Sequence, residues 1–164
     1  MRIQRLFMRI LPAAVLLASP LQAAVTVTYG EPDNFYDAGD RSSDPRKVMT
    51  SLAAHLKKEG ERLLPAGTDL KVEVLDLDRA GRTRMSMPGE IRVMTGRADA
   101  PCLWLRYHLE SEGKVLQSQD ERICDLDYLR PLEFRYESHD PLVYEKRLLD
   151  TWLRERFVKG TPPR

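Results

Sequence analysis

The segment CLWLRYHLESEGKVLQSQDERIC, residues 102–124, decides the fold. Every second residue from Leu103 to Leu109 is apolar, and polar or amphipathic residues occupy the positions between them. Turn-forming residues follow at 111–114, and a second strand runs from Val115 towards Cys124. This pattern predicts a β-hairpin with one face on a hydrophobic core.

The chain's two cysteines stand at the two ends of this hairpin. A three-residue loop at 112–114 would pair Ser111 with Val115, and therefore Cys102 with Cys124. Their spacing is not C-x-x-C, so a redox-active pair is not indicated. In an oxidising compartment two thiols of one small domain usually pair. We therefore expect a structural disulfide between Cys102 and Cys124.

Two amphipathic helices flank the strands in sequence. The first is predicted from Asp44-Pro45 to Leu64, because Asp can cap a helix and Pro suits the first helical position. The second begins at Asp140-Pro141, where the same signal recurs, and extends to Phe157. Apolar residues recur at helical spacing in both.

The remaining segments are shorter. We expect a strand at 25–29, a loop at 30–44, a strand at 70–77, a loop at 79–90 and a short strand at 91–94. Strict alternation in the second of these strands would put Asp76 and Asp78 on the apolar face. A bulge near Leu75 would instead turn Leu75 and Leu77 inward.

The order of these elements predicts an α+β fold. We expect a two-layer domain over residues 24–164, with an antiparallel sheet of about four strands and both amphipathic helices on one face. The 164 residues carry a net charge of +1, with 42% hydrophobic and 31% charged residues, which suits one globular domain. The charge is nearly balanced, so we expect no nucleic-acid partner.

Residues 1–23 resemble a secretory signal peptide. Arg2, Arg5 and Arg9 precede a short apolar run, and small residues follow, which favours cleavage after Ala23 or Ala24. An uncleaved anchor is the alternative, but the apolar run is much shorter than the roughly 20 residues that span a bilayer. We therefore expect a soluble, exported protein, most simply periplasmic, with no transmembrane segment after cleavage.

Four stretches resemble an uncharacterised family of short exported bacterial proteins, domain of unknown function 3016. They are residues 32–37 (PDNFYD), 76–81 (DLDRAG), 124–129 (CDLDYL) and 141–152 (PLVYEKRLLDTW). Arg79 departs from this pattern, which has Leu at that position, and neither cysteine belongs to it. The resemblance implies an exported α+β domain and assigns no activity.

Paired carboxylates are the best candidates for a metal site. Asp76 and Asp78, like Asp125 and Asp127, are two residues apart, so each pair can point one way from an extended strand. Such pairs suit a hard divalent cation or acid–base chemistry. The alternative is structural, because Asp is common where strands end and turns begin.

Other chemistry has little support. The three histidines, His55, His108 and His139, form no close-spaced ligand pair, so we expect no zinc site. The chain has no G-x-S-x-G elbow, no S-x-x-K segment and no glycine-rich phosphate loop. No cofactor is predicted, and a divalent cation is the one candidate.

The last helix offers a candidate interaction surface. Lys146, Arg147 and Arg154 lie around Trp152, as on a helix that contacts an anionic envelope surface or the groove of a partner. The alternative is that Trp152 belongs to the core and the charges form an ordinary solvated face.

The leading hypothesis is therefore a non-catalytic exported module that binds another envelope component, a protein. The alternative is a divalent-metal-binding protein or metal-dependent hydrolase that uses the clustered Asp residues.

Overall fold

A computed structural model describes residues 22–41, 43–87, 89–132, 136 and 139–160. The predicted signal peptide lies outside the described residues, except for its last two positions. Within the described ranges, no helix is long and apolar enough to cross a membrane.

A mixed four-stranded sheet forms the centre of the fold. Its strands are β1 (Ala24–Tyr29), β2 (Thr68–Asp78), β5 (Cys102–Ser111) and β6 (Lys114–Cys124), in the order β1-β2-β5-β6. Strands β2, β5 and β6 pair antiparallel, whereas β1 runs parallel to β2. The predicted α+β class is confirmed. A wholly antiparallel sheet is wrong, because a helix connects β1 to β2 and brings the chain back in the same direction.

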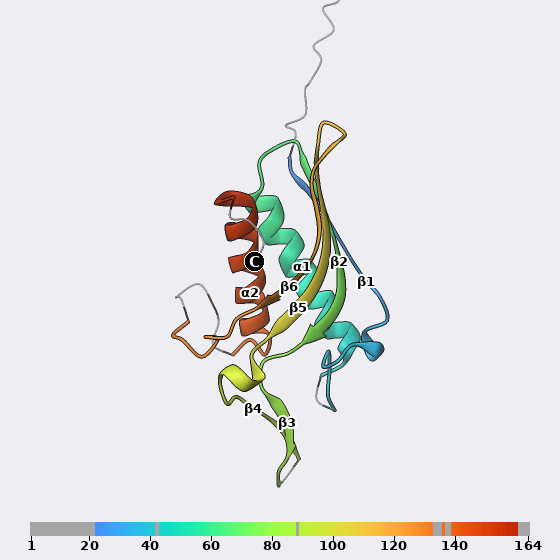
Figure 1. Cartoon of the computed structure of the whole chain (residues 1–164). Helices are drawn as coiled ribbons and strands as arrows, with labels where there is room; N and C mark the ends of the chain where they lie inside the picture. The colour runs from blue at the N-terminus through green and yellow to red at the C-terminus, as the bar shows by residue number, and fades with distance from the viewer. Residues whose placement is uncertain (1–21, 42, 88, 133–135, 137–138, 161–164) are drawn as a thin grey trace, which may run out of the picture.

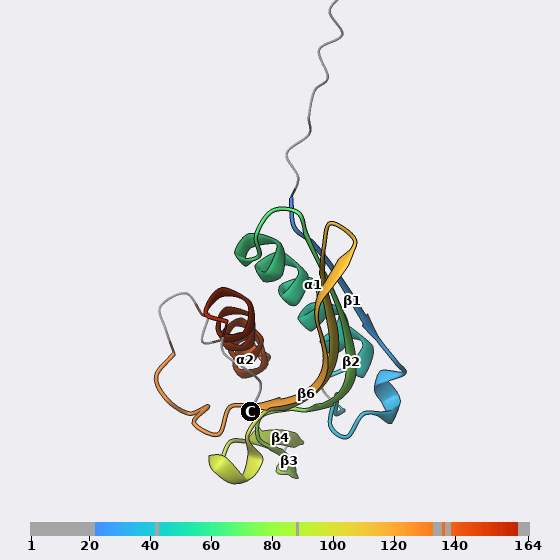
Figure 2. The same ribbon diagram turned by 45° about the horizontal axis from the view of Figure 1, so that its top comes forward.

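Two α-helices pack beside this sheet. Helix α1 (Pro45–Leu63) begins where predicted, and the Asp44 carboxylate accepts the amide N–H of Arg46 at 2.9 Å. Helix α2 (Val143–Leu153) begins just after Pro141, and Asp140 accepts the Leu142 N–H at 2.9 Å. A π-helical turn, η3 (Arg154–Val158), follows α2. Figure 2 shows both helices on one side of the curved sheet.

One large apolar cluster fills the space between sheet and helices. The residues that alternate along β5, from Leu103 to Leu109, are buried in it as predicted. Tyr107 meets the rings of Trp152 and Phe157 edge to face, with centroids 5.5 and 5.4 Å away. Trp152 is therefore a core residue that holds α2 against β5.

A bulge in β2 sets the direction of its acidic residues. The register shifts between Val74 and Asp76, so Leu77 is fully buried while Asp76 and Asp78 leave the core face. The predicted bulge is confirmed, but Leu75 is only half-buried.

The β5–β6 hairpin reaches the predicted cysteine pairing by a different route. Its turn has two residues, Glu112 and Gly113, which both have positive φ, as a tight primed turn requires. The expected three-residue loop is wrong. A register shift beside Leu109 then restores the alignment, and Cys102 lies opposite Cys124.

A second, small sheet extends from the end of β2. Strands β3 (Arg82–Met85) and β4 (Glu90–Val93) pair antiparallel, and Figure 1 shows this hairpin projecting from the body. The short strand expected near 91–94 is present, but the loop expected at 79–90 is wrong over β3. The segment escaped prediction because its side chains are mostly exposed and do not alternate in polarity. Short 3-10 turns, η1 (Pro32–Asn34) and η2 (Arg97–Asp99), complete the elements.

Candidate functional site

A cavity of about 570 Å³ lies where the beginnings of both helices meet. We call it the helix-start cavity. Its volume is that of a typical small-molecule site. Two stretches far apart in the sequence, 40–51 and 140–142, enclose it together with Arg79, which directly follows β2. Its lining residues are Asp40, Arg41, Ser43, Asp44, Lys47, Val48, Ser51, Arg79, Asp140, Pro141 and Leu142.

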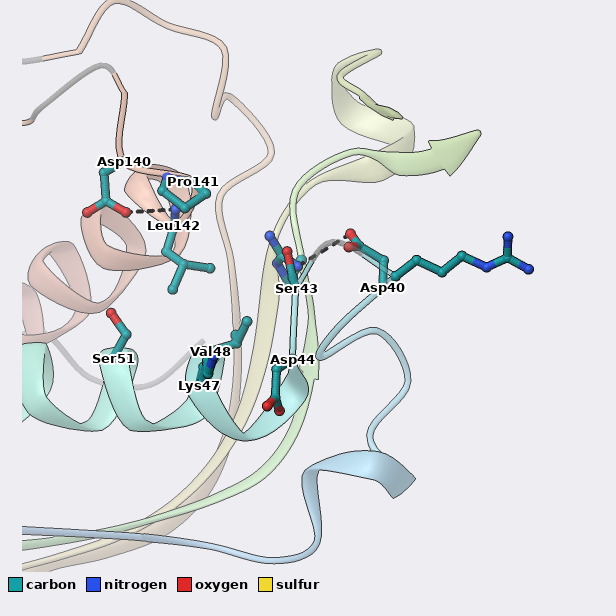
Figure 3. Close-up of a pocket in the computed structure, with 11 residues that line it drawn as sticks. Asp40, Ser43, Asp44, Lys47, Val48, Ser51, Asp140, Pro141 and Leu142 are labelled. Carbon is teal, nitrogen blue, oxygen red and sulfur yellow. Dashed lines mark hydrogen bonds and ion pairs between the residues drawn. The ribbon is translucent and has the colours of Figure 1, made fainter. Parts of the chain in front are cut away.

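The cavity has an apolar side, which Figure 3 shows. Leu142, in the segment before α2, points towards α1. Val48 and Ser51 lie on the side of α1 that faces Leu142. Pro141 extends the apolar side, and Asp44 points away to cap its helix. A ligand here would therefore meet both carbon and polar groups.

Arg79 contributes a buried positive charge to the lining. The residue is only 3% exposed, and its Nε and Nη1 atoms have no hydrogen-bond partner in the described part of the chain. Its ion pair with Asp40 is long, 3.7 Å between Nη1 and Oδ2. Burial lowers the pKa of Arg79, and the nearby guanidinium of Arg92 lowers it further. The environment therefore compensates this cation incompletely.

Arg92 explains why Asp40 does not satisfy Arg79. Arg92, on β4, forms two hydrogen bonds to Asp37 of 2.8 and 2.9 Å and a third to Asp40 of 3.3 Å. Asp40 is thus shared by two guanidinium groups, and Arg92 has the shorter contact. The same bonds attach the β3–β4 hairpin to the loop before α1.

Glu145, on α2, lies in the interior near Arg79. Its Oε1 accepts the Ala80 N–H at 2.8 Å, while its Oε2 has no hydrogen-bond partner among the described residues. The side chain is buried, and this burial raises the pKa of Glu145. A carboxyl and a guanidinium that both lack full hydrogen bonding therefore lie in the interior at this end of the molecule.

The other charges of the lining differ in how they are paired. Arg41 contacts Glu90 at 3.4 Å, and Asp140 binds Lys146 at 2.6 Å. Lys47 is exposed and makes no ion pair with any residue that the structure describes. Among the described residues, Lys47 is thus the basic group of the lining without an ion pair, and Arg79 is the one whose ion pair, with Asp40, is long.

The first pair of predicted metal ligands is occupied by other partners. Asp76 accepts the N–H groups of Tyr36 and Leu77, each at 2.8 Å. Asp78 forms a 2.8 Å ion pair with Arg82. These contacts attach the loop before α1 and the β3–β4 hairpin to the end of β2.

The second pair is used in a turn. Asp125 contacts Arg147 at 3.0 Å and accepts the N–H of Asp127 at 3.1 Å. Over the described ranges, no three His, Cys, Asp or Glu side chains come together as metal ligands. The structure therefore does not unite the four aspartates.

The three basic residues proposed as an interaction surface occupy different environments. Arg147 is 1% exposed and lies in the interior. Lys146 is half-buried and pairs with Asp140, while Arg154 lies 4.0 Å from Asp150. They do not form one exposed patch.

The cysteines form the expected disulfide. Cys102 and Cys124 are bonded, with an S–S distance of 2.08 Å. The bond joins the ends of the hairpin strands away from the turn, as predicted from their positions in the sequence.

A histidine–carboxylate pair lies in the groove between α1 and α2. His55 Nε2 is 2.7 Å from Asp150, which also accepts a 2.8 Å hydrogen bond from the Tyr136 hydroxyl. Such a pair can orient an imidazole as a base. No Ser, Thr or Cys side chain is hydrogen-bonded to His55 in the part of the chain described, so a nucleophilic triad is not assembled there.

Sequence reasoning missed Arg79 and Glu145 as site residues. Charged residues are seldom fully buried, so a pattern of polarity assigns them to the surface. The departure of Arg79 from the family pattern was the only signal in the sequence.

Comparisons with known proteins describe the chain's relatives. No curated protein matches it. The PelC dodecamer from Paraburkholderia phytofirmans is similar over 80% of this chain and 81% of that chain, at 15% identity and a TM-score of 0.32. The crystal structure of an uncharacterized protein is similar over 85% of both chains, at 12% identity and a TM-score of 0.29. A model of the proteins of unknown function DUF3016 matches residues 23–155, and the chain therefore belongs to this family.

Proposed function

We propose that the protein is a non-catalytic binding module of the bacterial envelope, exported to the periplasm, which docks on another envelope protein through the helix-start cavity. The observation that carries this proposal is an open cavity of about 570 Å³ lined by the buried, incompletely paired Arg79. Ligand sites are commonly concave, mostly apolar, and supplied with a few oriented polar groups.

Two features support export. Residues 1–23 carry the signal-peptide pattern. The Cys102–Cys124 disulfide suits an oxidising compartment such as the periplasm.

The frame around the cavity supports a binding role. We take the sheet as one layer and the two helices, on the same face of it, as the second layer. The cavity then lies at one end of the helical layer. Hydrogen bonds at Asp44 and Asp140 fix the starts of the two helices that enclose it. A site fixed in this way can recognise a partner with little rearrangement.

Site-specific photocrosslinking in the native cell tests the docking site. A benzophenone amino acid replaces Lys47 at the cavity or, as a control, Lys71, which lies on β2 away from the cavity. We expect a discrete crosslinked protein from position 47 only, and its loss when Ser51→Phe fills the cavity. Identical products from both positions, or products that persist in Ser51→Phe, would overturn the proposal.

Cell fractionation with N-terminal sequencing tests export. We expect a periplasmic protein that begins at Ala24 or Val25. A full-length chain in the membrane fraction would instead identify the N-terminal segment as an uncleaved anchor.

A further inference from the structure

The unused donors of Arg79 indicate what kind of group the helix-start cavity accepts. A buried N–H without a partner is unfavourable in proteins, and more so when the group is charged. Arg79 Nε and Nη1 are such groups, and the residue lines the cavity. Both atoms are buried, so the guanidinium has to turn towards the cavity before an oxygen anion there can supply the missing partner and neutralise it.

We infer that the cavity binds a carboxylate carried on an apolar group, namely the C-terminal residue of the partner protein, with Arg79 as its counter-charge. This inference rests on the proposed function, because it names the part of the partner that occupies the same cavity.

The charges of the lining favour a single negative charge. Lys47 makes no ion pair with the described residues, and Arg79 has only the long, 3.7 Å contact with Asp40. Asp44 and Asp140 also border the cavity. A phosphate dianion would be repelled by these carboxylates, whereas a monoanion needs only one cation.

The apolar side specifies what the carboxylate is attached to. Val48, Pro141 and Leu142 offer carbon surface within the same cavity. A polypeptide's last residue carries a main-chain carboxylate and a side chain on one carbon atom. An apolar side chain there would contact Leu142 and Val48 while its carboxylate meets Arg79.

NMR titration of the ¹⁵N-labelled mature protein tests the inference. The probe is N-acetyl-leucine, and its control is N-acetyl-leucinamide, which has the same shape without the charge. We expect the acid to shift the Arg79 Nε–H signal and to bind at least tenfold more tightly than the amide. Inorganic phosphate and anionic phospholipid vesicles serve as competing anion sources.

Three variants separate specific binding from general charge effects. Arg79→Gln removes the counter-charge, and Ser51→Phe fills the cavity while it keeps Arg79. Arg46→Gln is the matched control, because Arg46 is exposed on the first turn of α1 but does not line the cavity. We expect the first two variants to lose acid binding and the control to keep it. If Arg79→Gln does not fold, the loss or retention of acid binding in Ser51→Phe decides whether the cavity is the binding site.

Each other outcome has a definite meaning. Equal binding of acid and amide would overturn carboxylate recognition, while crosslinking at Lys47 could still support the cavity as the docking site. Binding of phosphate or vesicles in preference to the acid would overturn the inference in favour of a phosphate group. No binding of the acid would overturn it as well, and the photocrosslinking result would decide the proposed function independently.

Discussion

The guanidinium of Arg147 lies 3.0 Å from the carboxylate of Asp125, and the two side chains are 2% and 10% exposed. Arg147 also donates hydrogen bonds to the backbone carbonyls of Tyr128 and Arg130. One side chain of α2 therefore holds the whole 125–130 turn against the helix. The contact is an interior charge pair rather than a surface for a partner.

Removal of this side chain should destabilise the protein strongly. Arg147→Met leaves Asp125 and two carbonyls without their donor, and breaking a buried pair typically costs about 3 kcal/mol or more. Denaturant unfolding measures the loss. Arg46→Met, at an exposed pair, should change the free energy of unfolding far less. Equal losses in the two variants would contradict the structural role of Arg147.

Loss of the disulfide should also lower stability. Cys102 and Cys124 are 22 residues apart, and closing a loop of this size contributes about 3 kcal/mol through the unfolded chain. We expect Cys102→Ala/Cys124→Ala to unfold at a correspondingly lower denaturant concentration with its fold retained. An unchanged free energy of unfolding would show that the bond is not formed in the mature protein.

Glu145 should make stability depend on pH. Burial raises the pKa of Glu145 above its ordinary value of 4.5, although the Ala80 N–H and the charge of Arg79 oppose this. The protonated form is therefore favoured in the folded state, and stability is lost as pH rises through the folded pKa. Glu145→Gln mimics the protonated form, so its melting temperature should rise relative to wild type between pH 4 and 8. A difference in melting temperature between Glu145→Gln and wild type that becomes smaller as pH rises would contradict the prediction.

Asp140 supplies a control of opposite sign. Burial alone would raise the pKa of Asp140, but hydrogen bonds from Lys146 and Leu142 outweigh it and hold the pKa below 3.8. Its stabilising contribution is present above that value and is lost as pH falls. The advantage of wild type over Asp140→Asn should therefore shrink in acid.

Gly60 should be intolerant of alanine although it lies within a helix. Gly→Ala in a helix interior usually stabilises by roughly 0.5–1 kcal/mol. Here the added Cβ would lie 2.8 Å from Val25 Cγ2, and a β-branched side chain cannot easily rotate away. We expect Gly60→Ala to destabilise by about 1 kcal/mol or more.

A double variant checks the cause. The sign should reverse in a Val25→Ala background, which removes the contact, as thermal unfolding of the four proteins would show. A stabilising Gly60→Ala in the wild-type background would mean that β1 docks less closely on α1.

Divalent cations should not stabilise the protein, because Asp76, Asp78 and Asp125 already bind N–H groups or arginines. A cation at 100 times its dissociation constant would add about 2.7 kcal/mol to the free energy of unfolding. We expect melting temperatures with calcium, magnesium, manganese or zinc to match a chelated sample at equal ionic strength. A specific increase that Asp78→Asn abolishes would establish the alternative, a metal-dependent protein.

The parts of the fold that sequence predicts are those with a local cause. Helix α1 follows from its apolar spacing and the Asp44 cap, and the β5–β6 hairpin from alternation and a turn. The direction of β1 has no local cause: Val25 and Val27 would alternate in the same way in a parallel or an antiparallel pair. The direction of β1 is set by α1, which follows β1 in the chain, packs against the sheet and returns the chain to the start of β2.

The candidate site was less predictable for a related reason. Polarity patterns assume that charges face solvent, yet Arg79, Glu145 and Arg147 are buried. The helix-start cavity also combines residues that are about 100 positions apart, such as Ser43 and Leu142. The periodicity of one segment does not show which distant residues will line the same cavity.

The position of the disulfide determines how the hairpin can come apart. The turn at Glu112 and Gly113 closes one end of β5–β6, and the Cys102–Cys124 bond closes the other, so the two strands form a covalent ring. Such a ring cannot fray from its open end, because it has none. Strand separation must instead begin between the two closures, at pairs inside the ring. The pair next to the disulfide, Leu103 and Ile123, also lies in the core, so covalent closure and apolar burial hold the same end of the hairpin together.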